Sequence, residues 1–480
     1  MTAGARSMGD GAVSLVLRDV EVEGRAGQCV EVSGDTVTYV GPPEGRRAGA
    51  RRAAVVDGRG GALLPGLHDH HLHLLALAAR RRSVACGPPE VTGPDGLGAA
   101  LRAAAAARRP GEWVRAVGHD DTVTGPLDAR SLDDLLGPLA DRPVRVQHRS
   151  GQRWVLNSAA LEAARRSLGP AGLEALGHGA ARGLLVGADV ALRAAWAGDA
   201  WPPLDGVGAD LARSGVTGVT DASVATGPEE VAFIARAQAA GALAQRVRVL
   251  GTAAPEAGGR ISRGPAKLVL TDGRLPGLDE LVAEVAAIGG RGVALHCVTR
   301  ESLVLAAVAL GRAGGGGHRI EHASVAPPDV VALLAPLGVT VVTQPGFVAA
   351  HGDRYLAEVD ADDRPWLYRL AGWSSAGVAL AGSTDGPFGP LDPWGAARAA
   401  VTRTTASGAL VGPAEALSPE RAVGLFLGPL EDPGGPARRV AAGRPADLCL
   451  LWVPWAEARR ALGAGLVRAT FAAGVAVFGG

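Results

Sequence analysis

Short apolar runs recur through the middle of the chain, each bounded by Gly, Pro or Asp and followed by a longer Ala- and Leu-rich stretch. Continuous apolar runs of this kind are typical of parallel strands that are buried on both faces, with helices between them. The runs predict strands within eight segments, at residues 61–73, 215–223, 246–253, 266–273, 292–298, 318–324, 338–345 and 377–386. Eight alternating strand–helix units predict an α/β fold, and within that class a (β/α)8 TIM-type barrel.

The two ends of the chain follow a different pattern, in which β-branched residues alternate with polar ones between Gly and Asp turns. This pattern predicts short strands over residues 12–64 and again over 438–480. Because the termini of a domain often lie close together, we expect both segments to form one small β-sandwich. The barrel then occupies residues 65–437, and residues 1–11, which are small and polar, are expected to form a flexible tail.

Residues 75–213 do not fit the eight-unit count. They contain strand-like segments of their own, at 113–121 and 143–151, and several Ala-rich helical stretches. We interpret this region as a large insertion after the first barrel strand, on the catalytic face, where it would cap the site.

Composition limits the classes of partner. Lys and Arg together number 48, as do Asp and Glu, so the net charge is zero and no basic field attracts nucleic acid or an anionic membrane. The four cysteines lie far apart with no pairing pattern, as expected of reduced thiols in a cytoplasmic protein. No uncharged apolar run reaches membrane-spanning length. The expected partner is therefore a small-molecule substrate, and a homo-oligomer is compatible with the sequence.

The single lysine, Lys267, stands among 48 basic residues, all the others being arginine. Arginine forms salt bridges at least as well as lysine does, but it cannot act as a neutral amine. A desolvated lysine can lose its proton and then form a Schiff base or take up carbon dioxide as a carbamate. A lysine left by chance in a salt bridge is the alternative interpretation.

Polar residues gather where the predicted strands end, which is the face on which such barrels carry out chemistry. His71 and His73 end the first strand, and strand alternation places both imidazoles on one face, where they can hold one metal ion. Later strands contribute Lys267, His296, His322 and Asp385. Imidazole and carboxylate together suit zinc, with iron, manganese or nickel as alternatives. The sequence therefore predicts a site for one or two divalent metal ions.

The remaining histidines carry weaker expectations. His68 and His70 are expected to support the neighbouring pair or to serve structure, with His70 pointing away. His318 begins its strand at the opposite end of the barrel and is left out of the site. Contact with substrate is a minor expectation for the histidines of the insertion and loops, which are His119, His148, His178 and His351.

A divalent metal lowers the pKa of bound water to about 7, which supplies hydroxide at neutral pH. Asp385 is expected to orient that water, to accept its proton during attack and to return the proton to the leaving nitrogen. A one-metal site that uses a subset of the ligands is one arrangement. In the two-metal arrangement, carbamylated Lys267 bridges an ion held by His71, His73 and Asp385 and an ion held by His296 and His322.

These residues lie in segments that resemble the metal-dependent amidohydrolase superfamily, and within it the branch called amidohydrolase family 3 (YtcJ-like). The segment LPGLHDHHLHL resembles the family's Pro-Gly-x-x-Asp-x-His-x-His signature, which assigns Asp69, His71 and His73. AKLVLTDG, RIEHASV and AGSTDGPFGPLDPW are similar to further family segments, and the match covers nearly the whole chain. The resemblance implies hydrolysis of a carbon–nitrogen bond in a small amide, formamide or cyclic amide, most often with zinc bound.

Two segments depart from the family pattern on the substrate side. The family usually has His-x-x-Gly-Asp after the fifth strand, where residues 296–300 read HCVTR, and Gly-His in the insertion, where this chain has Gly151 and Gln152. As a hypothesis, Arg300 binds a substrate carboxylate. An outward-facing arginine paired with Glu301 or other nearby acids is the alternative. The candidate substrate-binding residues are Gln152, Arg300 and Asp272.

The barrel fold hosts many chemistries, so the fold alone does not name the substrate. Hydrolysis of an ester or lactone, or deamination of a ring, is an alternative reaction at the same site. A catalytically silent homologue that serves as a binding protein is an alternative from another class. Loss of metal ligands would favour that class, and no ligand of the family pattern is lost here.

Overall fold

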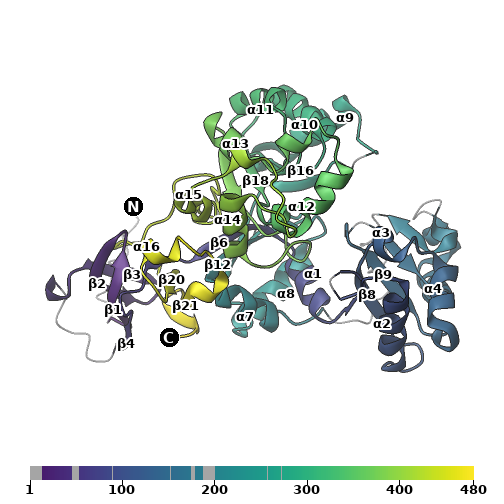
Figure 1. Ribbon diagram of the computed structural model, residues 1–480, viewed down its shortest axis with the longest axis horizontal. Helices are drawn as coiled ribbons and strands as arrows, with labels where there is room; N and C mark the ends of the chain where they lie inside the picture. Colours follow the sequence, from purple (N-terminus) through teal and green to yellow (C-terminus); the bar gives the residue numbers. More distant parts are fainter. Residues whose placement is uncertain are drawn as a thin grey trace, which may run out of the picture. The chain divides into compact units, whose positions relative to one another are not determined.

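The computed structural model describes residues 13–45, 53–88, 90–151, 153–174, 179–186, 201–256, 258–271 and 273–480 (Figure 1). The chain forms two compact units. One is the segment Leu75–Pro203, and the other combines the described residues before Leu75 with Leu204–Gly480. The expected tail at 1–11, Gln152, His178 and Asp272 lie outside the described residues.

The two ends of the chain form two four-stranded sheets, with the orders β3-β2-β1-β4 and β22-β21-β20-β5. One hydrophobic cluster contains side chains of both sheets, including Leu17, Val30, Leu450 and Phe471. Because these side chains are shielded from water only when the sheets pack together, the shared core joins the N-terminal and C-terminal segments. The strands are β1 (Leu15–Val22), β2 (Arg25–Ser33), β3 (Thr36–Gly41), β4 (Ala54–Asp57), β5 (Leu63–Pro65), β20 (Leu448–Leu451), β21 (Val467–Ala472) and β22 (Val475–Phe478).

The same unit contains two entirely parallel sheets, with the orders β14-β13-β12-β6 and β15-β16-β17-β18-β19. Each of the eight segments expected to hold a strand contributes one strand to these two sheets, and β14 is an additional short strand. Every residue of β6, β12 and β17 is buried, as expected of parallel strands covered on both faces. The strands are β6 (Leu67–Leu72), β12 (Val216–Asp221), β13 (Arg246–Val249), β14 (Ile261–Arg263), β15 (Ala266–Val269), β16 (Val293–Cys297), β17 (Arg319–His322), β18 (Thr340–Thr343) and β19 (Ala379–Gly382).

Backbone hydrogen bonds connect these two sheets at two places. The amide of Lys267 in β15 donates to the carbonyl of Leu250, directly after β13 (2.8 Å). The amide of Asp385, just after β19, donates to the carbonyl of His71 in β6 (2.9 Å). The ends of strands from both sheets are therefore held side by side.

Helices follow most of the parallel strands along the chain. Side chains of α9, α10 and α11 share a hydrophobic cluster with β16, β17 and β18. The side chain of Thr299 caps α10 by accepting a hydrogen bond from the amide of Ser302 (3.3 Å), so this helix begins soon after β16 ends. The helices of this unit are α7 (Asp205–Arg213), α8 (Pro228–Ala239), α9 (Leu278–Ile288), α10 (Arg300–Ala313), α11 (Pro328–Leu334), α12 (Gly346–Glu358), α13 (Ala371–Ser375), α14 (Pro393–Thr402), α15 (Pro419–Gly424) and α16 (Trp455–Ala458).

The unit formed by Leu75–Pro203 has its own sheet, with the order β11-β10-β9-β8-β7, and its own hydrophobic core. Leu97 and Leu101 of α2 pack in that core with Leu132 of α4 and Val146 of β9. Its strands are β7 (Val84–Ala85), β8 (Val114–His119), β9 (Val144–His148), β10 (Arg153–Leu156) and β11 (Leu184–Val186). Its helices are α1 (Leu74–Arg81, which begins one residue earlier), α2 (Pro94–Ala106), α3 (Asp121–Thr124), α4 (Ala129–Leu136) and α5 (Ser158–Glu174).

None of the helices in the described part of the chain combines the length and the apolar character that a membrane crossing requires.

Candidate metal centre

Five of the six residues expected to bind metal lie at or just after the carboxyl ends of the parallel strands, and Lys267 is the second residue of its strand. His71 is in β6 and His73 directly follows that strand, while Asp385 follows β19. Lys267, His296 and His322 lie in the neighbouring strands β15, β16 and β17. Parallel strands end at one edge of a sheet, so six residues far apart in the sequence meet there.

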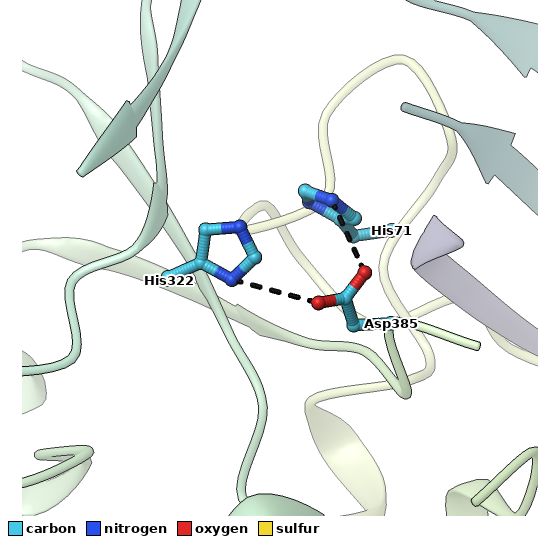
Figure 2. A group of neighbouring side chains, drawn as sticks. All are labelled: His71, His322 and Asp385. Atoms are coloured by element: carbon cyan, nitrogen blue, oxygen red, sulfur yellow. Dashed lines mark ion pairs between the residues drawn. The ribbon is translucent and has the colours of Figure 1, made fainter. Parts of the chain in front are cut away.

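Two imidazoles and one carboxylate form the centre of this group. His71, His322 and Asp385 are buried, and each offers a ligand atom within 4.8 Å of the others (Figure 2). His71 Nε2 lies 3.6 Å from Asp385 Oδ1, and His322 Nδ1 lies 3.9 Å from Asp385 Oδ2. His73 Nε2 lies 3.3 Å from the same Oδ1 atom of Asp385.

His296 and Lys267 extend the group on the adjacent strands. The ring of His296 meets the ring of His322 edge to face, with 4.4 Å between the centroids. The side chain of Lys267 is buried, and its Nζ has no hydrogen-bond partner among the described residues. Burial is the main cause that lowers the pKa of Lys267, although the negative charges of Glu321 and Asp385 act in the opposite direction. A buried amine without a partner is costly, and the lowered pKa favours its neutral, nucleophilic form.

Backbone geometry explains how consecutive strand residues reach one site. His322 and Ala323 have positive φ values of 73° and 49°, which interrupt the ordinary alternation of side chains at the end of β17. Asp385 also has a positive φ, 53°. Such backbone conformations are uncommon for residues other than glycine and persist where the surroundings hold them, often at functional sites.

The Nδ1 atoms of three of the histidines have hydrogen-bond partners outside the centre. His71 Nδ1 donates to Glu321 Oε2 (2.5 Å), and His322 Nδ1 donates to Gln344 Oε1 (2.8 Å). His73 Nδ1 is hydrogen-bonded to the hydroxyl of Ser223 (3.0 Å). In a neutral imidazole whose Nδ1 carries the proton, Nε2 carries the lone pair. The partners of His71 and His322 therefore leave Nε2 as the atom able to bind a metal.

The imidazoles are held in the form that binds metal. Burial is the main cause that lowers the pKa of His71 well below its ordinary value. It also lowers the pKa of His296 and of His322 to about 3. These side chains are therefore neutral at pH 7. Asp385 Oδ1 is buried and lacks a hydrogen-bond partner among the described residues, although the Nε2 atoms of His71 and His73 lie near it. Two imidazole nitrogens and a carboxylate oxygen that lie this close together could bind the same divalent cation.

Asp69 joins the segment containing Asp385 to β6. Its carboxylate accepts hydrogen bonds from the hydroxyl (2.5 Å) and the amide (3.1 Å) of Thr384, and from the amide of His71 (3.3 Å). Complete burial raises the pKa of Asp69 to about 7, although the hydrogen bonds from Thr384 act in the opposite direction. Asp69 therefore joins the two ligand-bearing segments through hydrogen bonds to Thr384 and His71.

Arg300 lies outside the cluster of metal-binding candidates. It is the first residue of α10, its side chain is 47% exposed, and it forms an ion pair with Asp329 (2.7 Å). This geometry agrees with the outward-facing alternative, although the acid is Asp329 and not the adjacent Glu301. An exposed pair of this kind contributes little to stability.

The remaining histidines have separate surroundings. His68 and His70 are buried beside the centre, and His68 Nδ1 donates to the carbonyl of Gly428 (2.9 Å). His318 Nε2 is hydrogen-bonded to the carbonyl of Gly314, and His351 Nε2 is hydrogen-bonded to the carbonyl of Phe388. His119 and His148 lie in the unit formed by Leu75–Pro203.

Sequence reasoning did not identify Glu321, Gln344 or Ser223, which orient the histidines. Glu321 stands next to His322, so strand alternation alone places it on the opposite face. The detectable signal was the occurrence of Arg319 and Glu321 in a strand expected to be buried, because buried charges are rare unless they have a partner or a role.

Comparison with known proteins identifies the family of this chain. The sequence profile of the amidohydrolase family matches residues 54–478. An N-substituted formamide deformylase from Arthrobacter pascens is 25% identical, and the alignment covers 92% of each chain. Two uncharacterized metal-dependent hydrolases have similar structures. The one from Pyrococcus furiosus has a TM-score of 0.66 and 22% identity, covering 91% of this chain and 98% of the other. The one from Pyrococcus horikoshii OT3 has a TM-score of 0.69 and 20% identity, covering 91% and 97%.

The family profile spans most of the chain, including all six residues expected to bind metal. The structural similarity covers the same fold over nearly the whole length of both Pyrococcus proteins. This chain belongs to the amidohydrolase family and is a hydrolase.

Proposed function

We propose that the protein is a metal-dependent hydrolase that cleaves a non-peptide carbon–nitrogen bond in a small amide, formamide or cyclic amide. The observation that carries the proposal is the convergence of His71, His322 and Asp385 at one buried point, with His73 beside them. Family membership supports the reaction class, and the relative from Arthrobacter pascens is named for the deformylation of N-substituted formamides.

The donor set suits a divalent transition metal, and zinc fits neutral imidazole and carboxylate ligands best. The residues that would hold one ion are His71, His73 and Asp385, and those for a second are His296 and His322. A metal bound here would polarise the scissile carbonyl and lower the pKa of a coordinated water.

Asp385 performs the proton transfers in this proposal. Its carboxylate accepts the proton of the attacking water and returns it to the nitrogen that leaves. Protonation is needed because an amide anion is a poor leaving group, whereas a neutral amine departs readily. The adjacent cis peptide Gly386-Pro387 and the hydrogen bond from the amide of Phe388 to the carbonyl of Asp385 (2.8 Å) belong to the loop that carries this carboxylate.

Lys267 is the proposed bridging residue. Its amine is buried among the metal-binding candidates, and burial lowers its pKa, which favours reaction of the free amine with carbon dioxide. The resulting carbamate would supply an anionic oxygen ligand toward each of two ions. A Schiff base is disfavoured by the surrounding metal ligands.

The proposal extends to architecture and location. The two parallel sheets, connected by the hydrogen bonds of Lys267 and Asp385, are proposed to form one (β/α)8 barrel. The two terminal sheets with their shared core are proposed to form a β-sandwich, and Leu75–Pro203 the insertion that carries Gln152. A cytoplasmic location remains the expectation from the four cysteines, which lie far apart in the sequence without a pairing pattern.

An activity screen on metal-loaded protein tests the proposal. The substrates are N-acyl amines, N-substituted formamides and cyclic amides, and the Asp385→Asn variant serves as the blank. Release of amine by the wild-type protein, and none by the variant, is the expected result. Turnover of esters or lactones alone would overturn the carbon–nitrogen assignment, and equal rates for both proteins would overturn the role of Asp385.

A further inference from the structure

Glu321 connects a metal-binding histidine to a buried arginine. Its side chain is fully buried, and Oε2 accepts the hydrogen bond from His71 Nδ1 (2.5 Å). Arg319 donates from Nε to Oε1 (2.8 Å) and from Nη2 to Oε2 (3.1 Å). The same Nη2 atom donates to the carbonyl of His70 (2.8 Å), next to His71 in β6. The three side chains therefore form a continuous chain of hydrogen bonds from Arg319 to His71.

The partner of His71 differs in charge from the partners of the other two histidines. Gln344 and Ser223 are neutral, whereas Glu321 is an acid paired with arginine. The two hydrogen bonds from the guanidinium of Arg319 favour the carboxylate form of Glu321. A carboxylate that accepts the Nδ1 proton makes Nε2 more electron-rich and a stronger metal ligand than a neutral acceptor does.

Stability alone does not account for this pair. Removing two charges from water costs several kcal/mol per ion, and buried ion pairs are often no more stabilising than apolar side chains of the same volume. Arg369 and Glu415 provide a comparison within the same unit. Glu415 accepts the amide hydrogens of Leu370 and Gly372, so that pair secures backbone at the start of α13. Glu321 instead accepts a hydrogen bond from His71, an imidazole of the candidate metal centre.

We propose that Glu321 is a positioning residue for the metal centre, and that Arg319 holds it in place. Glu321 fixes His71 in the tautomer that carries its proton on Nδ1, and it strengthens Nε2 as a ligand. The inference rests on the proposed function, because it concerns a ligand of the same centre. It assigns a role to two buried charges that the hydrolytic mechanism does not otherwise use.

Zinc affinity measured by competition with a chromophoric chelator tests the inference, at one pH and on protein reloaded with zinc. The Glu321→Gln variant removes the charge and retains an acceptor. The double variant Arg319→Gln/Glu321→Gln removes both charges and avoids an unpaired buried arginine. The matched control is Arg369→Gln/Glu415→Gln, which removes a largely buried pair that is hydrogen-bonded to backbone groups of Ala326, Leu370 and Gly372. Thermal unfolding shows which variants are folded.

Both Glu321 variants are expected to bind zinc about 10–100-fold more weakly than the wild type, and the control within about 2-fold of it. Cobalt-loaded Glu321→Gln should also show a shifted visible absorption spectrum, which a merely structural role would leave unchanged. Folded variants with wild-type zinc affinity would overturn the inference. If neither variant folds, Glu321→Asp decides: weaker binding by this shortened carboxylate supports the inference, and unchanged binding overturns it. A wild-type protein that binds no zinc would instead overturn the proposed function.

Discussion

The amide of Asp385 donates a hydrogen bond to the carbonyl oxygen of His71 (2.9 Å), so two residues expected to bind the same ion are also joined through their backbones. Two residues after His71 and one residue after Asp385, the amide of His73 donates to the carbonyl of Gly386 (2.8 Å). These bonds hold the end of β6 against the loop after β19. The ligands are therefore positioned before any metal binds, which reduces the ordering that binding requires.

Asp385→Asn should abolish hydrolysis while leaving the fold intact. The amide keeps the volume of the carboxylate but can neither accept the proton of water nor supply an anionic ligand. We expect kcat to fall by about 10²–10⁴-fold. Steady-state kinetics on metal-loaded protein checks this, with thermal unfolding as the control for folding. A variant that retains more than about a tenth of wild-type kcat would contradict the assignment.

Lys267→Ala should lose both metal and activity if the lysine carries a carbamate. The substitution also leaves space beside His296, into which a short carboxylate can diffuse. We expect activity to fall on the order of 100-fold and to recover in part when acetate or propionate is added. The matched chloride salt is the control for ionic strength. Full activity and metal content in the variant would show that Lys267 only borders the site.

Acidification should destabilise the metal-free protein. Burial lowers the pKa of His296 and His322 from the ordinary 6.5 to about 3. Between these two pH values the two side chains are protonated in the unfolded chain but neutral in the folded chain. The associated stability is present above pH 6.5 and is lost as the pH falls toward 3. Each histidine contributes a slope of about 1.4 kcal/mol per pH unit within that window.

Asp69 has the opposite effect on the pH dependence of stability from that of the histidines. Its pKa is raised from 3.8 to about 7, so the folded chain holds this proton and gains stability as the pH falls through that range. Burial also lowers the pKa of His68, His70 and His71, so the histidines outweigh the single acid. Urea unfolding of metal-free protein at pH 7.5 and 5.5 checks the sign. Equal or greater stability at pH 5.5 would contradict the burial of neutral histidines.

Arg403 should be a major contributor to the stability of the fold. Its guanidinium is fully buried and donates to the carbonyls of Val411 (2.9 Å), Tyr368 (2.9 Å) and Leu367 (2.8 Å). Arg403→Met would leave these carbonyls without a donor, at a cost of about 3 kcal/mol or more. The free energy of unfolding in urea checks this. Arg398→Met serves as the control, because Arg398 is exposed and donates a hydrogen bond to the carbonyl of Leu462.

The positions of the parallel strands along the chain could be predicted, and the polar residues near their ends could be named as candidates, because both depend on local pattern. Buried parallel strands appear as continuous apolar runs, and polar residues at the ends of such runs are conspicuous. His71, His296, His322 and Asp385 were identified in this way, and the structure brings them together.

The orientation of the histidines could not be predicted in the same way. Glu321 contacts His71 from a strand distant in the sequence, and His322 reaches the same centre only because its φ is positive. Both features depend on tertiary packing, which overrides strand alternation. The partner of Arg300 is similarly non-local, because Asp329 lies at the start of a different helix.

The transition-metal content of the wild-type protein, expressed and purified without chelator, tests the central claim most directly. The account predicts one to two equivalents per chain, with activity lost on removal of the metal and restored when zinc is returned. Less than about a third of an equivalent, in a folded protein that does not gain activity on addition of zinc, manganese or iron, would contradict it.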